Sequence, residues 1–107
     1  MPTVYIINRS AHDFSDAKRY GELEFLTQGS VNRFSTGNMA RIFTEKLAQS
    51  SPDDYLLPTG LSIMTAIACA VFALRHKRLN LLLWKNMGEK GSYIERVLDF
   101  SNLEEGD

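Results

Sequence analysis

The chain has 107 residues, of which 44% are hydrophobic and 23% are charged. This length suits one domain with its own core, and the composition excludes a chain that is mainly disordered. The 12 basic and 13 acidic residues give a formal net charge of −1, so no overall positive field favours general nucleic-acid binding, although a small anion can be held locally. We expect a single domain over residues 1–100 and an acidic, frayed tail over residues 101–107.

The cysteine and the amino-terminal residues bear on the compartment. Cys69 is the single cysteine of the chain, so no intramolecular disulfide can form, and its apolar neighbours predict a buried thiol. The amino-terminal residues, Met-Pro-Thr-Val-Tyr-Ile-Ile-Asn, have the pattern of a strand and lack the basic leader of a signal peptide. Both features favour a cytoplasmic protein. Because His76 is flanked by cations and Asp53-Asp54 lacks a partner at ligand spacing, we expect neither a metal nor a cofactor.

The first part of the chain has the pattern of two strands. Val4 to Ile7 is β-branched and aromatic, which predicts a buried strand. Residues 11–20 leave room for a short helical turn. Glu22 to Thr27 alternates charged and apolar residues, as in a strand with one side in solvent.

A surface helix is expected next. Ser35 or Thr36 can cap it, and Ser50-Ser51-Pro52 ends it, because proline forces its predecessor out of helical geometry. Its apolar residues recur every three to four positions, which predicts one face packed on a core; they are Met39, Ile42, Phe43 and Leu47.

A short strand and a strongly apolar helix follow. Tyr55 to Leu57 reads as a strand that is buried on both sides. Leu61 to Leu74 is apolar apart from Ser62 and Thr65, and the cations of residues 75–78 suit a helix end. The run is shorter than the roughly 20 residues of a membrane span. It therefore predicts a buried helix, or one partly covered by a second copy, and we expect a homodimer through Leu61 to Leu74 with no membrane partner.

The last elements complete the expected fold. Leu79 to Trp84 reads as an interior strand, residues 86–91 as a turn, and Ser92 to Phe100 as an antiparallel strand. The order β-β-α-β-α-β-β, with crossovers of helical length, predicts a mostly parallel sheet with an antiparallel carboxyl-terminal strand. The expected fold class is α/β, a small Rossmann-like sandwich.

In such a sheet, ligands bind beyond the carboxyl ends of the parallel strands. The strand from Val4 to Ile7 and the strand from Tyr55 to Leu57 are each followed by polar residues or glycine. We expect these two groups of residues to lie at the same edge of the sheet. The first amides of a helix are unpaired and carry partial positive charge, which suits a phosphate; a plain turn capped by Thr59 is the alternative. The candidate ligand-binding residues are Asn8, Arg9, Ser10, His12, Thr59, Gly60 and Ser62.

Two of these residues have a second reading. Arg9 suits a phosphate or a base, or else forms an ion pair with Asp13 or Asp16. His12 suits general acid or base catalysis, or else caps a turn, since no nucleophile accompanies it apart from Ser15, too close in sequence for a triad. The strand aromatics are expected in the core; they are Tyr5, Phe25, Tyr55 and Trp84.

Residues 51–74 resemble the signature of the CRISPR-associated Rossmann-fold domains, which sense cyclic oligoadenylates as dimers. That signature is an apolar strand, then Thr-Gly-Gly-Thr-Lys, then an apolar helix with a methionine near its start. Thr59 and Gly60 match its first two residues, Ser62 falls at the second threonine, and Met64 lies near the methionine position. The departures are Leu61 for the second glycine and Ile63 for the lysine.

The stretches HDFSDA, SSPDDYLL, HKRLNLLLWK and YIERVLDF are similar to small proteins of tailed bacteriophages. Together the two resemblances imply a phage protein that binds, and sequesters, a cyclic oligonucleotide signal of host defence, in the host cytoplasm. Two alternatives stay open. One is a phosphodiesterase or ring nuclease that uses His12, and the other is a protein inhibitor of a host factor whose contact surface is the helix from Met39 to Leu47.

Overall fold

The computed structural model describes residues 1–102 and shows a five-stranded sheet with two α-helices. The strands lie in the order β2-β1-β3-β4-β5, parallel except for the antiparallel pair β4 and β5, so the predicted α/β fold is confirmed. Most of the predicted acidic tail lies outside the described residues. The elements are β1 (Thr3–Ile6), the 3₁₀ helix η1 (Ser15–Arg19), β2 (Glu22–Phe25), α1 (Thr36–Lys46), the 3₁₀ helix η2 (Leu47–Gln49), β3 (Tyr55–Leu57), α2 (Ser62–His76), β4 (Arg78–Met87) and β5 (Lys90–Asp99).

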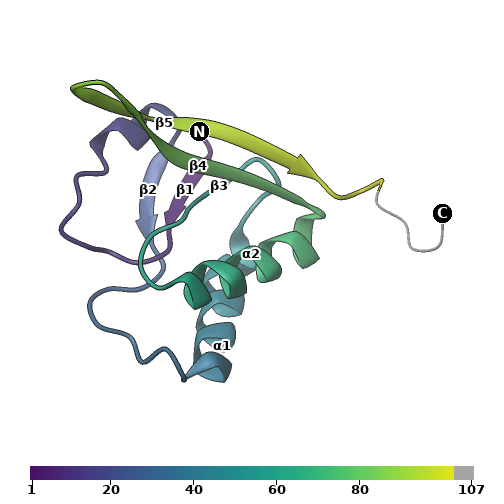
Figure 1. Ribbon diagram of the computed structural model, residues 1–107. Coiled ribbons are helices and arrows are strands. Elements are labelled where there is room, and N and C mark those ends of the chain that lie inside the picture. Colours follow the sequence, from purple (N-terminus) through teal and green to yellow (C-terminus); the bar gives the residue numbers. More distant parts are fainter. Residues whose placement is uncertain (103–107) are drawn as a thin grey trace.

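The order of the strands explains how the crossovers are distributed. The step from β1 to β2 runs one way across the sheet, whereas the steps from β2 to β3 and from β3 to β4 run the other way. Parallel crossovers are almost always right-handed, so opposite steps place their connections on opposite faces. Both α1 and α2 accordingly cover one face, and η1 lies on the other (Figure 1).

Each face of the sheet has its own buried cluster, because successive strand residues point to opposite sides. In β1, Tyr5 packs with the helices, while Val4 and Ile6 pack with the η1 segment. Phe43 and Phe72, which come from α1 and α2, are fully buried in the helix-side cluster. Burying each such side chain contributes about 1.5–3 kcal/mol to the stability of the fold.

Helix α1 is the predicted surface helix. Ser35 is its N-cap residue and accepts the amide of Met39 through its carbonyl oxygen at 3.0 Å. Met39, Phe43 and Leu47 are buried in the core. Within the predicted contact surface from Met39 to Leu47, only the exposed side chains, such as Arg41, Thr44 and Glu45, are therefore available to a partner.

Helix α2 has an apolar outer face. Met64, Ala68 and Phe72 face the sheet and are fully buried, as predicted. The opposite side exposes Ala66, Ala70 and Leu74, and the Leu74 side chain is 83% exposed. No helix within residues 1–102 is long and apolar enough to cross a bilayer.

The β4–β5 hairpin is longer than the sequence indicates. Its turn occupies only Gly88 and Glu89, and paired residues run from Met87↔Lys90 to Arg78↔Asp99. Because the strand ladder from β3 reaches β4 only at Leu81, the hairpin tip projects past the sheet (Figure 1). The predicted core position of Trp84 is therefore wrong: this side chain is 50% exposed.

Candidate functional site

The carboxyl ends of β1 and β3 form the switch point of the sheet. These strands are neighbours, and the amide of Ile7 donates to the carbonyl of Leu57 at 3.2 Å just beyond the ladder. From this point the chain after β1 turns to the η1 face, and the chain after β3 turns to the α2 face (Figure 1). Diverging connections open a crevice at such a point, which is where ligands bind in α/β sheets.

A cleft of about 670 Å³ lies on the η1 side of this edge, a volume typical of small-molecule sites. One wall is formed by residues 12–16, which lead into η1 and form its first turn. The opposite wall is the β4–β5 hairpin, and the loop after β3 forms the rim. The lining residues are His12, Asp13, Phe14, Ser15, Asp16, Leu57, Pro58, Thr59, Gly60, Leu82, Leu83, Trp84 and Tyr93.

Aromatic rings stand on both walls of this cleft. Trp84 and Tyr93 pack edge to face with ring centroids 4.9 Å apart, and His12 meets Phe14 in the same way at 6.3 Å. The Trp84 ring also lies close to Gly91, which leaves no room there for a side chain. The indole is therefore held in place by its neighbours while half of it stays exposed, as a stacking platform requires.

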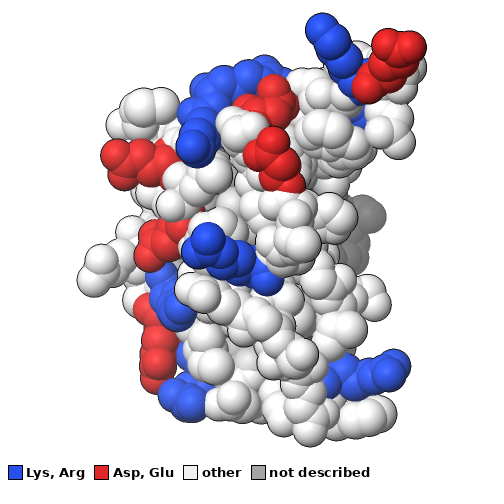
Figure 2. All heavy atoms as spheres, turned by 90° about the vertical axis from the view of Figure 1, so that its left-hand side faces the viewer, with Lys and Arg blue, Asp and Glu red and all other residues white. Residues whose placement is uncertain are grey.

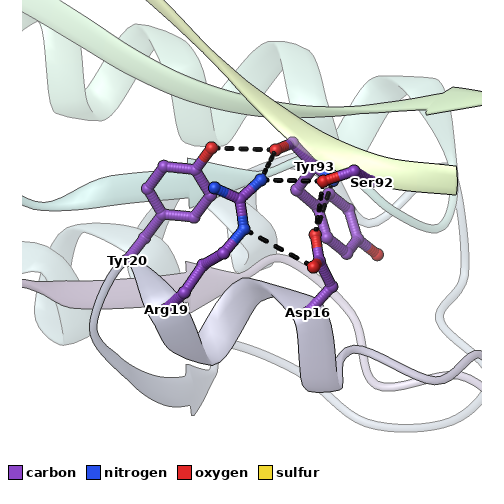
Figure 3. A network of polar contacts seen from close by, with 5 residues as sticks. All are labelled: Asp16, Arg19, Tyr20, Ser92 and Tyr93. Atoms are coloured by element: carbon purple, nitrogen blue, oxygen red, sulfur yellow. Dashed lines mark hydrogen bonds and ion pairs between the residues drawn. The ribbon is translucent and has the colours of Figure 1, made fainter.

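A polar network fixes the distance between the two walls (Figure 3). Asp16 Oδ2 accepts the Tyr93 amide at 2.7 Å and the Ser92 hydroxyl at 3.0 Å. Arg19 Nη2 donates to Ser92 Oγ at 2.8 Å and to the Tyr93 carbonyl at 2.5 Å. The Tyr20 hydroxyl donates to the same carbonyl at 2.8 Å. Because these bonds join η1 to β5, the width of the cleft is set by the fold before any ligand arrives.

The cleft carries negative charge. The hydrogen bond from the Tyr93 amide, helped by the Ser92 hydroxyl and Arg19, lowers the pKa of Asp16, and the bonds from Ser15 lower the pKa of Asp13. Both carboxylates are therefore ionised at neutral pH. No Lys or Arg lines the cleft among the described residues, and residues 1–102 hold no group of three potential metal ligands.

The protein surface beside the cleft has no dominant charge. Figure 2 shows the side that carries the loops at the left of Figure 1, where basic and acidic side chains are interspersed around uncharged residues. A large polyanion finds no continuous positive area in this view.

A second, smaller cavity of about 290 Å³ opens at the amino end of α2. Leu61 is the N-cap residue and makes no side-chain capping bond, so Thr59 does not cap the helix. Gly60 has a φ of +89°, and a Cβ there would lie 3.0 Å from Asn8 Cβ. Gly60 lines both cavities, so the two cavities meet at this residue. The residues of the smaller cavity are Asn8, Gly29, Ser30, Val31, Gly60, Leu61 and Met64.

The structure brings together four of the seven predicted ligand-binding residues. His12, Thr59 and Gly60 line the cleft, and Asn8 joins Gly60 in the smaller cavity. Asn8 Nδ2 donates to the Gly29 carbonyl at 3.2 Å, which ties the exit of β1 to the loop after β2.

The other three predicted residues line neither cavity. The Arg9 guanidinium lies over the Phe25 ring, 4.9 Å from its centroid. The alternative, an ion pair with Asp13 or Asp16, is not formed within residues 1–102. Ser10 accepts the backbone amide of His12 at 3.4 Å, and Ser62 is exposed on the first turn of α2.

Sequence reasoning missed the aromatic and acidic lining of the cleft. The sequence predicts Trp84 in the core and Tyr93 in a strand, and it gives no ligand-binding role to Phe14 or Asp13, although all four line the cleft. The signal lay in the hairpin register, because a two-residue turn at Gly88 places Trp84 opposite Tyr93.

Comparison with known protein families gives a match over nearly the whole chain. The family described as phage Pam3 gp32-like protein matches residues 2–100, whereas no curated protein and no solved structure matches the chain. The local resemblance to CRISPR-associated Rossmann-fold domains receives no support from these comparisons. The family match covers nearly the whole chain and agrees with the phage resemblance. The chain therefore belongs to the phage Pam3 gp32-like protein family.

Proposed function

We propose that this phage family member binds a cyclic nucleotide or oligonucleotide, with a base in the aromatic cleft and a phosphate at the amino end of α2. The observation that carries the proposal is the position of Gly60 between the two cavities. A single ligand that crosses this residue reaches rings on one side and unpaired helix amides on the other.

The cleft suits a nucleobase in shape and polarity. Its floor contains Leu57 and Leu82, which are almost fully buried, and the exposed half of Trp84 offers a flat apolar surface. Stacking of a base on an aromatic side chain contributes about 1–3 kcal/mol. A planar ring that enters between the η1 wall and the hairpin wall gains this contact while its polar edge stays near Asp13 and His12.

The smaller cavity suits a phosphate. None of its lining residues is acidic, and it lies at the amino end of α2, where the first turn has no side-chain cap. A cyclic phosphodiester carries one negative charge, whereas a triphosphate carries several. Arg19 forms an ion pair with Asp16, whereas Asp13 has no such partner among the described residues. Because the Asp13 carboxylate makes the adjoining cleft negative, the ligand class of low charge is favoured.

Sequestration, with the ligand left intact, is the proposed activity, and infection would place the protein in the host cytoplasm. The position of His12 in the cleft supports a second candidate, cleavage of the bound phosphodiester by general acid or base catalysis. An inhibitor of a host protein is the third candidate. Its contact surface would have to be the polar outer side of α1, where Arg41 and Glu45 form an ion pair.

We also propose that α2 forms a homodimer interface. Its outer side exposes Ala66, Ala70 and Leu74, whereas the outer side of α1 is charged. Small residues allow a second helix to approach closely, and Leu74 supplies apolar area at the end of the contact. Size-exclusion chromatography with light scattering should give a dimer that Ala70→Glu splits and that Thr44→Glu, on the exposed side of α1, leaves intact. A strict monomer would remove the dimer from the proposal.

The binding test is calorimetry and thermal shift with cyclic mono-, di-, tri- and tetranucleotides and NAD-derived signals. We expect stabilisation by at least one cyclic nucleotide, and a loss of affinity of about tenfold or more in Trp84→Leu. Phe34→Leu is the matched control, because Phe34 is 84% exposed and lines neither cavity. Stabilisation by none of these compounds would refute nucleotide binding.

The same complexes separate sequestration from cleavage. Mass spectrometry of the released ligand should recover the intact compound after prolonged incubation. Accumulated product that disappears in His12→Ala, with binding retained, would instead establish the ring-nuclease alternative.

A further inference from the structure

Asp13 brings a carboxylate to the cleft that the fold leaves partly free. Its Oδ1 accepts the amide of Ser15 at 2.9 Å, and within residues 1–102 it forms no ion pair. Asp16 differs, since Tyr93, Ser92 and Arg19 occupy its two oxygens. Of the two acidic residues in the cleft, Asp13 is thus the one that can still accept hydrogen bonds from a ligand.

This carboxylate restricts what a bound base can present. The bonds from Ser15 hold Asp13 in its ionised form, so it accepts hydrogen bonds and cannot donate them. Guanine places two donors side by side, the N1 hydrogen and the 2-amino group, in the spacing of the two carboxylate oxygens. Adenine places an acceptor nitrogen beside its 6-amino group, which repels a carboxylate brought close to both.

We infer that the cleft selects guanine over the other bases, with Asp13 as the specificity-determining residue. The inference rests on the proposed function, because it needs a base in the cleft. Asp13 and Trp84 line the same cleft, so a ring that stacks on the indole can turn its hydrogen-bonding edge toward the carboxylate. Asp13 is exposed to solvent, which limits the expected preference to about tenfold.

The test uses 3′,5′-cyclic GMP, cyclic IMP and cyclic AMP as probes in calorimetry. Inosine lacks only the 2-amino group of guanosine, so it isolates one of the two donors. We expect cyclic GMP to bind about tenfold more tightly than cyclic IMP or cyclic AMP, and Asp13→Asn to abolish this preference. Asp53→Asn is the matched control, because Asp53 is exposed and lines neither cavity.

A rescue experiment separates recognition from general damage. Xanthine carries a carbonyl oxygen where guanine carries the 2-amino donor, which matches the amide of an asparagine. Cyclic XMP should therefore bind Asp13→Asn better than it binds the natural protein.

The possible outcomes distinguish this inference from the proposed function. Equal binding of the guanine, inosine and adenine probes, or a preference that Asp13→Asn retains, overturns guanine selection and leaves nucleotide binding standing. Binding of none of the cyclic nucleotides overturns the proposed function, and guanine selection with it.

Discussion

Replacing Gly60 with alanine tests the rim shared by the two cavities. A left-handed backbone costs a residue with a Cβ about 1–2 kcal/mol, and the lower entropy of the unfolded alanine chain offsets about 0.4–1 kcal/mol of this. The new Cβ would also lie 3.0 Å from Asn8 Cβ. Asn8 must then shift, which weakens its bond to Gly29 and the 2.9 Å bond that it accepts from Thr27, each of which contributes about 1 kcal/mol. We expect Gly60→Ala to lower the free energy of unfolding by about 2–3 kcal/mol.

The matched control is Gly88→Ala. Gly88 has a similar φ of +72°, but no atom lies within 4 Å of a Cβ built there, so only the backbone terms apply and the cost is about 1 kcal/mol. Urea unfolding, followed by far-ultraviolet circular dichroism and by Trp84 fluorescence, measures both variants. Equal destabilisation of the two variants would show that the contact with Asn8 adds nothing to the cost of Gly60→Ala.

Three further predictions concern the hairpin and two titrating side chains. In Gly91→Ala, the new Cβ would lie 2.2 Å from Trp84 Cζ2, so the indole must leave its place, at a cost of about 1–3 kcal/mol; an unchanged native emission maximum would contradict this. The hydrogen bond from the Tyr93 amide lowers the pKa of Asp16 below 3.8 in the folded state. The ionised Asp16 therefore stabilises the fold fully above pH 3.8. This stabilisation is lost as the pH falls further, because the unfolded chain takes up the proton first. Asp16→Asn should therefore flatten the fall in urea midpoint between about pH 5 and pH 2.5, and a fall as steep as that of Asp53→Asn would refute it. Burial, and then Arg75, lowers the pKa of His76 below 6.5, so the folded state favours the neutral ring and stability drops as the pH falls below about 6.5. His76→Gln should remove that drop, and persistence of the full drop in this variant would exclude His76 as its source.

The fold was largely predictable because its signals are local. The β-branched run at Val4 to Ile7 and the apolar spacing from Met39 to Leu47 each fix an element and its buried side, and both were confirmed. The hairpin was less predictable. Trp84 is a large aromatic residue in an apolar strand, which is typical of a core position. Its exposure depends instead on how far the neighbouring strand extends, and β3 pairs with β4 only at Leu81.

The candidate site was only half predictable for a related reason. Sequence reasoning identifies residues that follow strands, and it found Asn8, His12, Thr59 and Gly60 in this way. It cannot tell which of two available partners a side chain contacts. Arg9 stacks on Phe25, from the neighbouring strand, where an ion pair within its own loop was the expected alternative.

The position of the site follows from the direction in which the chain crosses the sheet. The step from β1 to β2 opposes the later steps, so the right-handed rule puts η1 on one face and α2 on the other. The two connections diverge at the carboxyl ends of β1 and β3, and Gly60, which follows β3, lines a cavity on each side. The cavity on the η1 side takes the rings of Trp84 and Tyr93 from the projecting hairpin and the carboxylates of Asp13 and Asp16 from the opposite wall. The cavity at the amino end of α2 has no acidic lining residue. A ligand with one aromatic ring and one adjoining single negative charge matches this division, and a ligand with clustered negative charge does not.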